Sequence, residues 1–180
     1  MLNYFEGKEP TDLPKTVNKL MPKASNKFTV KTVNPITVTD ADTALKYDYT
    51  FYLPDYLTVN HNVAYLNLNL DRFPAGTILK DDRWIPVELN STEKHIFVCT
   101  FKIPEGYEVR DIPKNSSYEN KLFGYNHSYS IHNREITVKT MVTMNFQVIE
   151  DKEMAQFREM LSQLNSNYFK TIAIYKTLTK

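Results

Sequence analysis

The chain has little of what disulfide-rich proteins and many enzymes depend on. Its 180 residues include one cysteine and four glycines. A single cysteine excludes an internal disulfide framework and a zinc site built from several thiolates. None of the glycines forms a G-x-G-x-x-G, Walker A or G-x-S-x-G pattern. The sequence therefore indicates neither a phosphate-binding loop nor the nucleophile turn of a serine hydrolase.

An excess charge of one sign and long apolar runs are also lacking. The 22 basic and 21 acidic residues leave a net charge of +1, so we do not expect a nucleic-acid partner. No apolar run approaches the roughly 20 residues that a membrane span needs. The opening MLNYFEGKEPTDLP has neither the basic nor the apolar region of a signal peptide, and we expect it not to be one.

What the chain does contain favours β structure. It has 18 threonines, 12 tyrosines and 10 phenylalanines, and such β-branched and aromatic residues suit a pleated, half-buried surface. Its 16 asparagines favour turns. A length of 180 residues fits one domain with a short appendage.

Two segments follow from the pattern along the chain. Residues 1–26 are polar and hold three prolines, which predicts a connecting arm with one short helix near 13–20. Residues 27–180 predict a β-sandwich domain. Alternating residues there predict strands over 28–32, 36–39, 43–53, 63–70, 84–89, 95–103, 107–110, 125–131, 135–148 and 168–178.

Several details of these strands are predicted as well. Residues 47, 49, 51 and 53 share one face, which we expect to be buried, and 95–103 has the pattern of a central strand. Asn67 and Asn69 alternate with leucines and predict a wet face. Asn133 fits the tight turn of a hairpin between 125–131 and 135–148, because asparagine tolerates positive φ.

One convincing helix precedes the last strand. Met154, Phe157, Leu161 and Leu164 recur at helical spacing, Asp151 can cap the start, and asparagines at 165 and 167 can end it. The predicted fold class is therefore mainly β: an antiparallel β-sandwich with one C-terminal helix before the last strand.

No residue is a convincing catalytic, cofactor-binding or metal-binding candidate. Cys99 lies mid-strand between phenylalanines, which predicts a small buried core residue rather than an activated thiol. No histidines have the i, i+4 spacing of a helical metal site, and we interpret all four as exposed turn or strand residues. His127 and His132, five apart, are predicted on opposite faces.

The acidic residues do not form a recognisable pair. The segment Asp40-Ala41-Asp42 starts like a calcium loop but lacks the later ligands, and a turn is the better interpretation. Asp81, Asp82 and Glu105 are loop acids whose spatial pairing the spacing does not predict. We predict no metal and no cofactor.

Tyrosine is the one excess with a functional interpretation. The residues Tyr47, Tyr49, Tyr52, Tyr107, Tyr125, Tyr129 and Tyr175 either fill the core and its rims or include an exposed platform for a sugar or a peptide. The alternative of a carbohydrate-binding or carbohydrate-active β-sandwich depends on the second possibility.

From about residue 65 onward the sequence resembles a known family. The stretch IPEGYEVRDIP at 103–113 is similar to an L-P-x-G-Y-x-V-x-x-L-P signature, and DRWIPV at 82–87 precedes it like an R-x-x-P-V element. Phe123-Gly124-Tyr125, Asn133, the helix and the final strand follow in order. This order resembles the C-terminal β-domain of unknown function in bacterial exported proteins that have a transglutaminase-like middle domain.

The resemblance implies that residues 1–26 are a linker arm from a preceding domain and that residues 27–180 are a non-catalytic accessory or interaction β-sandwich domain. This domain would pack on a transglutaminase-like neighbour, with a protein or glycan as a possible ligand. The family's catalytic Cys, His and Asp belong to the middle domain, and Cys99 does not match that nucleophile. We therefore expect this chain not to be an enzyme. The implied compartment is the periplasm or cell envelope.

Overall fold

The computed structural model divides the chain into two compact units, Met1–Tyr56 and Leu57–Lys180. It describes residues 9, 11–20, 23, 27–34, 37–38, 45–46, 48–74 and 85–177. The sequence places a boundary after residue 26 instead, so the predicted arm and part of the predicted sandwich share the first unit. We describe each unit by itself.

The first unit is a small helix-on-hairpin structure. Helix α1 (Leu13–Leu20), predicted near 13–20, packs on β1 (Thr29–Val33), which pairs antiparallel with β4 (Tyr49–Tyr52). The Asn18 side chain accepts a hydrogen bond from the Val30 amide at 2.9 Å, which fixes the helix to the strand. Its small core consists of the buried residues Val17, Phe28 and Val30.

The single strand predicted over 43–53 is wrong. The structure has two short strands there, β3 (Leu45–Lys46), which pairs with β2 (Thr37–Val38), and β4, which pairs with β1. Alternation alone does not show that a strand changes partner within a few residues. Of the face predicted to be buried, Tyr49 and Leu53 pack against the core, whereas Phe51 is exposed; Tyr47 lies outside the described residues.

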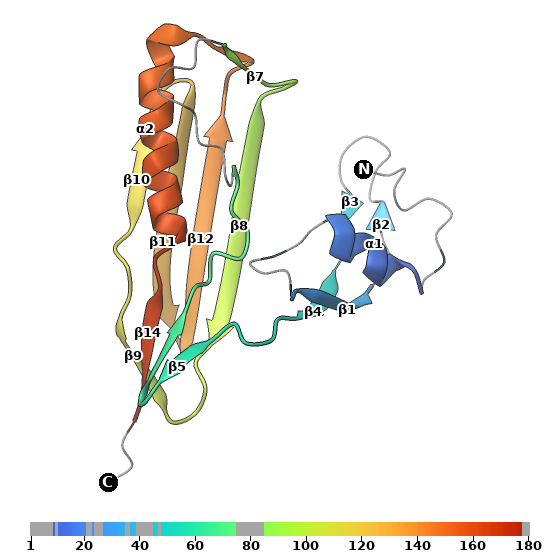
Figure 1. Ribbon diagram of the computed structural model, residues 1–180, viewed down its shortest axis with the longest axis vertical. Coiled ribbons are helices and arrows are strands. Elements are labelled where there is room, and N and C mark those ends of the chain that lie inside the picture. Colours follow the sequence, from blue (N-terminus) through green and yellow to red (C-terminus); the bar gives the residue numbers. More distant parts are fainter. Residues whose placement is uncertain are drawn as a thin grey trace. The chain divides into compact units, whose positions relative to one another are not determined.

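The second unit is organised around one long antiparallel sheet (Figure 1). Its strand order is β10 (Ser116–Glu119), β11 (Phe123–His132), β12 (Glu135–Met144) and β8 (Glu93–Lys102). Strand β8 is thus an edge of this sheet, and the prediction of a central strand at 95–103 is wrong. Its alternating burial follows the predicted pattern, but strand order depends on long-range pairing, which a local pattern does not contain.

The hairpin between β11 and β12 is confirmed. The two strands pair without a register shift from Phe123↔Met144 to His132↔Glu135. The two turn residues, Asn133 and Arg134, have φ angles of 47° and 62°. Positive φ at both positions is the signature of the hairpin turn whose twist matches the strands.

Short strands build the rest of the second unit. A second four-stranded antiparallel sheet has the order β5 (Thr58–Asn60), β6 (Val63–Leu66), β14 (Ile172–Lys176) and β9 (Tyr107–Asp111). A two-stranded ladder joins β7 (Val87–Glu88) to β13 (Val148–Ile149).

One face of the long sheet is covered along its length by two different structures (Figure 1). Helix α2 (Asp151–Tyr168) packs on one half, where Phe123, Val142 and Phe157 are buried together. The second sheet packs on the other half, where Ile136 and Val138 meet Ile174. The fold is therefore mainly β, with antiparallel sheets and one C-terminal helix before the last strand, as predicted.

The ends of α2 differ slightly from the prediction. Glu150, rather than Asp151, is the N-cap residue, and it makes no side-chain capping hydrogen bond. The helix also continues past Asn165 and Asn167 to Tyr168. It continues because Leu164 and Tyr168 are both fully buried, so that packing outweighs the weak helix propensity of asparagine.

Candidate functional site

The face of the long sheet opposite α2 is open to solvent, and we call it the open face. It carries side chains from β8, β12 and β11 in matched rows, because Ile96 pairs with Met141 and Met141 pairs with Asn126. Ile96 and Val98 are 52% and 60% exposed. The two aliphatic side chains lie two residues apart on the open side of β8, so they form a small exposed apolar surface.

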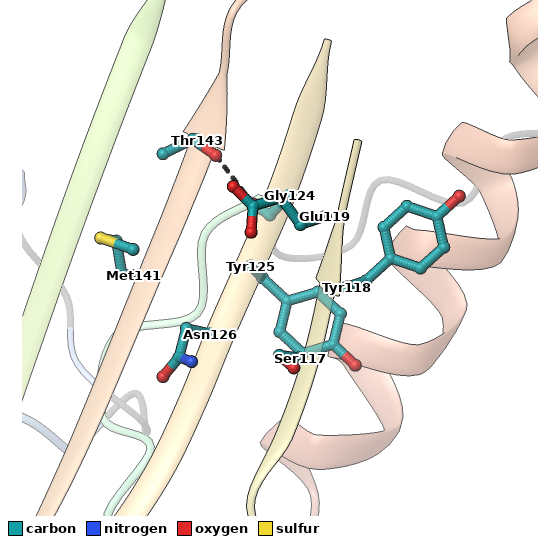
Figure 2. A pocket seen from close by; sticks show the side chains of 8 residues that line it. All are labelled: Ser117, Tyr118, Glu119, Gly124, Tyr125, Asn126, Met141 and Thr143. Carbon is teal, nitrogen blue, oxygen red and sulfur yellow. Dashed lines mark hydrogen bonds between the residues drawn. The ribbon is translucent and has the colours of Figure 1, made fainter. Parts of the chain in front are cut away.

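A shallow hollow marks one end of the open face (Figure 2). It has a volume of about 190 Å³, below the roughly 300–1,000 Å³ of typical small-molecule sites. The Tyr118 and Tyr125 rings point toward α2, away from the open side (Figure 2). The hollow therefore suits a protruding side chain better than a cofactor. Its lining residues are Ser117, Tyr118, Glu119, Gly124, Tyr125, Asn126, Met141 and Thr143.

Gly124 is required where β10 meets β11. A Cβ atom added to Gly124 would lie 2.7 Å from the backbone oxygen of Tyr118 and 3.2 Å from Cα of Glu119. Both are backbone atoms that cannot move without moving β10. Thr143 donates a hydrogen bond to the Gly124 carbonyl at 3.4 Å (Figure 2), which links this corner to β12.

Basic side chains flank the apolar centre of the open face. Lys139 pairs across the strands with Val98, and Lys94 pairs with Thr143. Within the part of the chain that the structure describes, neither lysine forms an ion pair. Their charges are therefore available to carboxylates of another molecule.

Cys99 lies on the covered face, as predicted. It is partly buried and packs against the cluster that contains Ile136 and Val138. Its strand position gives it no helix N-terminus, the feature that most often activates a thiol. The arrangement favours packing over nucleophilic chemistry.

Three of the four histidines occupy surface or rim positions. His61, with a φ of 52°, follows β5, and its Nδ1 lies 2.6 Å from Oδ1 of Asn60. The His95 ring stacks on Phe73 at a centroid distance of 3.7 Å, and its Nε2 lies 2.9 Å from a Glu93 oxygen. His132 is exposed at the end of β11. These positions bring no two of the three histidines into one site.

His127 corrects the sequence-based interpretation, which had all four histidines exposed. It is fully buried, on the face of β11 opposite to His132, as their spacing predicted. Its Nδ1 lies 2.8 Å from Oγ1 of Thr140, itself buried. Burial, with a smaller contribution from the positive charge of Lys170, lowers the His127 pKa to about 4. The ring is therefore neutral near pH 7.

The wet face predicted for Asn67 and Asn69 is also wrong, because both side chains turn inward. Asn67 Nδ2 donates to the Tyr168 carbonyl at 2.7 Å, and Asn69 Nδ2 donates to the Asn167 carbonyl at 3.4 Å. These carbonyls lie where α2 ends. Asn67 provides a partner for the Tyr168 carbonyl, whereas the Asn167 carbonyl also accepts a hydrogen bond from the Lys170 amide at 3.1 Å.

Buried polar side chains cross the covered face, and we call them the polar seam: Asn69, His127, Tyr129, Thr140 and Asn167. His127 lies between the two core clusters on β11, because Tyr125 belongs to the cluster under α2 and Tyr129 to the cluster under the second sheet. The sequence signal was the polar residue in the middle of each long strand, at 127 and 140.

The acidic residues do not assemble a metal centre in the described part of the chain. No group of three His, Cys, Asp or Glu side chains lies close enough there to hold an ion. Glu105 is an exposed residue in the turn before β9. The acids at 40, 42, 81 and 82 lie outside the described residues.

The tyrosines divide between the core and the rims. Tyr125 and Tyr129 are buried, while Tyr49, Tyr107 and Tyr175 are half-buried. Tyr52 is exposed in the first unit. On the outer face of the second sheet, Tyr65 is 39% exposed and shares that face with Tyr175. The Arg110 guanidinium stacks over the Tyr175 ring at 4.9 Å.

The exposed aliphatic residues of the open face were not predicted from the sequence. The sequence did contain a signal for them. In Ile96-Phe97-Val98-Cys99, apolar residues occupy both odd and even positions of one strand, and therefore both of its faces. In a sheet with one covered face, half of such a run must face away from the core.

A family of known sequences matches the second unit. A family model described as "Domain of Unknown Function with solved-structure structure (DUF3858)" matches residues 56–174. The chain is also similar in structure to a "putative protease" from Parabacteroides distasonis, with a TM-score of 0.53 and 15% sequence identity. The match covers 63% of this chain and 23% of that one, and at this identity it shows the fold alone.

A comparison with curated proteins gives no match. No helix in the described part of the chain is long and apolar enough to cross a membrane. The family model begins where the second unit begins and covers most of the 180 residues. The chain therefore belongs to the DUF3858 family.

Proposed function

We propose that the chain is a non-catalytic accessory domain of a larger transglutaminase-like protein, and that its open face contacts the neighbouring domain. The exposed Ile96 and Val98 carry this proposal, because the long sheet is covered on one face only, which leaves them without a packing partner among the described residues of the second unit. Lys94 and Lys139 beside them favour a neighbour with an apolar centre and carboxylates around it.

The match to less than a quarter of the Parabacteroides protein supports a modular role. A domain of this kind acts by burying surface against its neighbour, and such interfaces within one chain cover about 600–1,500 Å². It requires no nucleophile or metal of its own. We further propose the periplasm or cell envelope as its compartment, which cell fractionation with an antibody would test.

The binding test uses a transglutaminase-like domain encoded in the same reading frame, produced separately and titrated into this chain by calorimetry. Val98→Asp should weaken binding at least tenfold, since it places a carboxylate in the apolar centre. The matched control is Val59→Asp, because Val59 in β5 has the same 60% exposure. Equal effects of the two variants, or no such domain in the reading frame, would refute the proposed contact.

The absence of catalysis is tested separately with peptide, isopeptide and glycan substrates. The purified chain should turn over none of them. Turnover that one His, Asp or Glu substitution abolishes without unfolding the chain would refute the accessory role and promote the carbohydrate-active alternative.

A second candidate, carbohydrate binding, is favoured by one observation. Tyr65 and Tyr175 share the outer face of the second sheet, where Arg110 and Glu108 form an ion pair beside them. Aromatic faces with polar neighbours suit sugar rings. NMR titration with soluble peptidoglycan fragments should shift the signals of this face, and Tyr65→Ala should remove the shifts. Unchanged spectra would exclude binding of these glycans.

A further inference from the structure

Three buried polar atoms in the polar seam have no hydrogen-bond partner among the residues that the structure describes. They are Oδ1 of Asn69, Nε2 of His127 and the hydroxyl oxygen of Tyr129. All three residues are at least nine-tenths buried, with exposures of 3%, 0% and 6%. Buried polar groups without partners are uncommon in native proteins, and ordered water usually pairs with them.

The three residues are neighbours. His127 and Tyr129 lie two apart on one face of β11, with ring centroids 4.9 Å apart and the rings nearly perpendicular. The Asn69 side chain lies beside the Tyr129 hydroxyl and opposes the rise in the Tyr129 pKa that burial causes. A contact that lowers the pKa of a phenol comes from a donor, which in Asn69 is the amide Nδ2. It is too poorly aligned to be a hydrogen bond, because the Tyr129 hydroxyl has no partner among the described residues.

The remaining polar atoms of these side chains are already engaged. Nδ1 of His127 pairs with Thr140, and Nδ2 of Asn69 donates to the Asn167 carbonyl. Neither side chain can satisfy its free atom by rotating without breaking one of these bonds. The free atoms also differ in kind: an amide oxygen accepts, a phenol donates or accepts, and an imidazole nitrogen does one or the other according to tautomer.

We propose that the polar seam is an internal hydration site, in which one ordered water molecule bridges Asn69 Oδ1, His127 Nε2 and the Tyr129 hydroxyl. A water molecule donates two hydrogen bonds and accepts two, so it serves this mixed set in either tautomer of His127. An apolar ligand would leave the three atoms unsatisfied, so that water fits the site where such a ligand does not. The site lies where α2 and the second sheet meet, and the water would join the two covers of the long sheet.

The direct test is a high-resolution crystal structure of the chain. We expect a water peak within hydrogen-bond distance of at least two of the three atoms. Absence of such a peak in well-ordered density would overturn the proposal, whether or not any variant folds.

The change in Tm on removing the Tyr129 hydroxyl tests the proposal independently of the crystal structure. If water bridges the site, Tyr129→Phe removes a satisfied hydroxyl and should lower the Tm by a few degrees. If the hydroxyl is truly unpaired, the same change removes a buried group without a partner and should leave the Tm unchanged or raise it, which would overturn the proposal. A lowered Tm without a water peak would indicate a direct Tyr129–Asn69 bond and would also overturn it.

The matched control is Tyr168→Phe. The Tyr168 hydroxyl donates to the Phe73 carbonyl at 2.6 Å and needs no water. This variant should also lower the Tm, but the water peak beside His127 should remain in its crystal structure.

Discussion

At the scale of single residues, the most consequential is His127, because its burial makes the stability of the fold depend on pH. Its pKa is about 4 in the folded chain and near 6.5 when exposed in the unfolded chain. Between these values the unfolded chain binds the proton and the folded chain does not. Stability should therefore fall as the pH decreases from about 6.5 to 4, by roughly 3 kcal/mol.

Urea unfolding at pH 7 and pH 4.5 measures this loss. His127→Gln should reduce the difference between the two pH values, whereas His132→Gln should leave it unchanged because His132 is exposed. An equal loss in the wild type and in His127→Gln would assign the pH dependence to other groups.

Gly124 also affects the stability of the fold, although it has no side chain. Gly124→Ala should destabilise the chain by about 1–3 kcal/mol, because the new Cβ would meet the Tyr118 carbonyl oxygen at 2.7 Å and push β10 from β11. Ser130→Ala, on an exposed position of the same strand, is the control and should cost little. Equal urea midpoints for both variants would show that β10 adjusts freely.

At the scale of elements, the turn of the β11–β12 hairpin allows a specific prediction about stability. Asn133 has a φ of 47°, a conformation that a β-branched residue adopts only with strain. Asn133→Val should cost about 1–2 kcal/mol of unfolding free energy, whereas Asn133→Gly should be nearly neutral. Chemical denaturation of the two variants measures the difference, and a stable Val variant would mean that the turn changes type.

The elements that local sequence patterns define were predictable, but which strands pair with one another was not. The periodicity of Met154, Phe157 and Leu161 specified α2, and Asn133 specified the hairpin. Two features were predicted wrongly. Strand β8 is an edge strand rather than a central one, and the segment 43–53 contains two strands, β3 and β4, rather than one. Both depend on which distant segment pairs with a strand, and one sequence carries little information about such pairing.

The candidate site was less predictable than the fold. The positions of Cys99 and of His127 relative to His132 followed from alternation, because opposite parities in a strand face opposite sides. The burial of Asn69 did not follow, since it depends on where the carbonyls of Asn167 and Tyr168 come to lie. Those carbonyls are about a hundred residues away in the chain.

At the scale of the whole molecule, the two compact units should be separable. The family match begins at residue 56, and each unit has its own buried cluster. Residues 57–180 alone should therefore unfold cooperatively with a circular dichroism spectrum rich in β structure. Loss of a cooperative thermal transition in this fragment would show that residues 1–56 complete its core.

A shorter deletion should have a different effect. Removing residues 1–26 takes away α1, which buries Val17 against Phe28 and Val30. Amide hydrogen exchange in β1 and β4 should then become fast, while the second unit keeps its protection. Unchanged exchange in β1 and β4 would support the linker arm predicted from the sequence.

The pairing of β6 with β14 also determines when the fold can be completed during synthesis. Leu66 pairs with Ile172, whereas the long sheet forms mainly from strands close in sequence, such as β11 and β12. On the ribosome the long sheet can assemble first, while β5 and β6 wait for more than a hundred further residues. Until β14 is synthesised, half of the covered face stays exposed, so the nascent chain presents Ile136 and Val138 to chaperones as it grows.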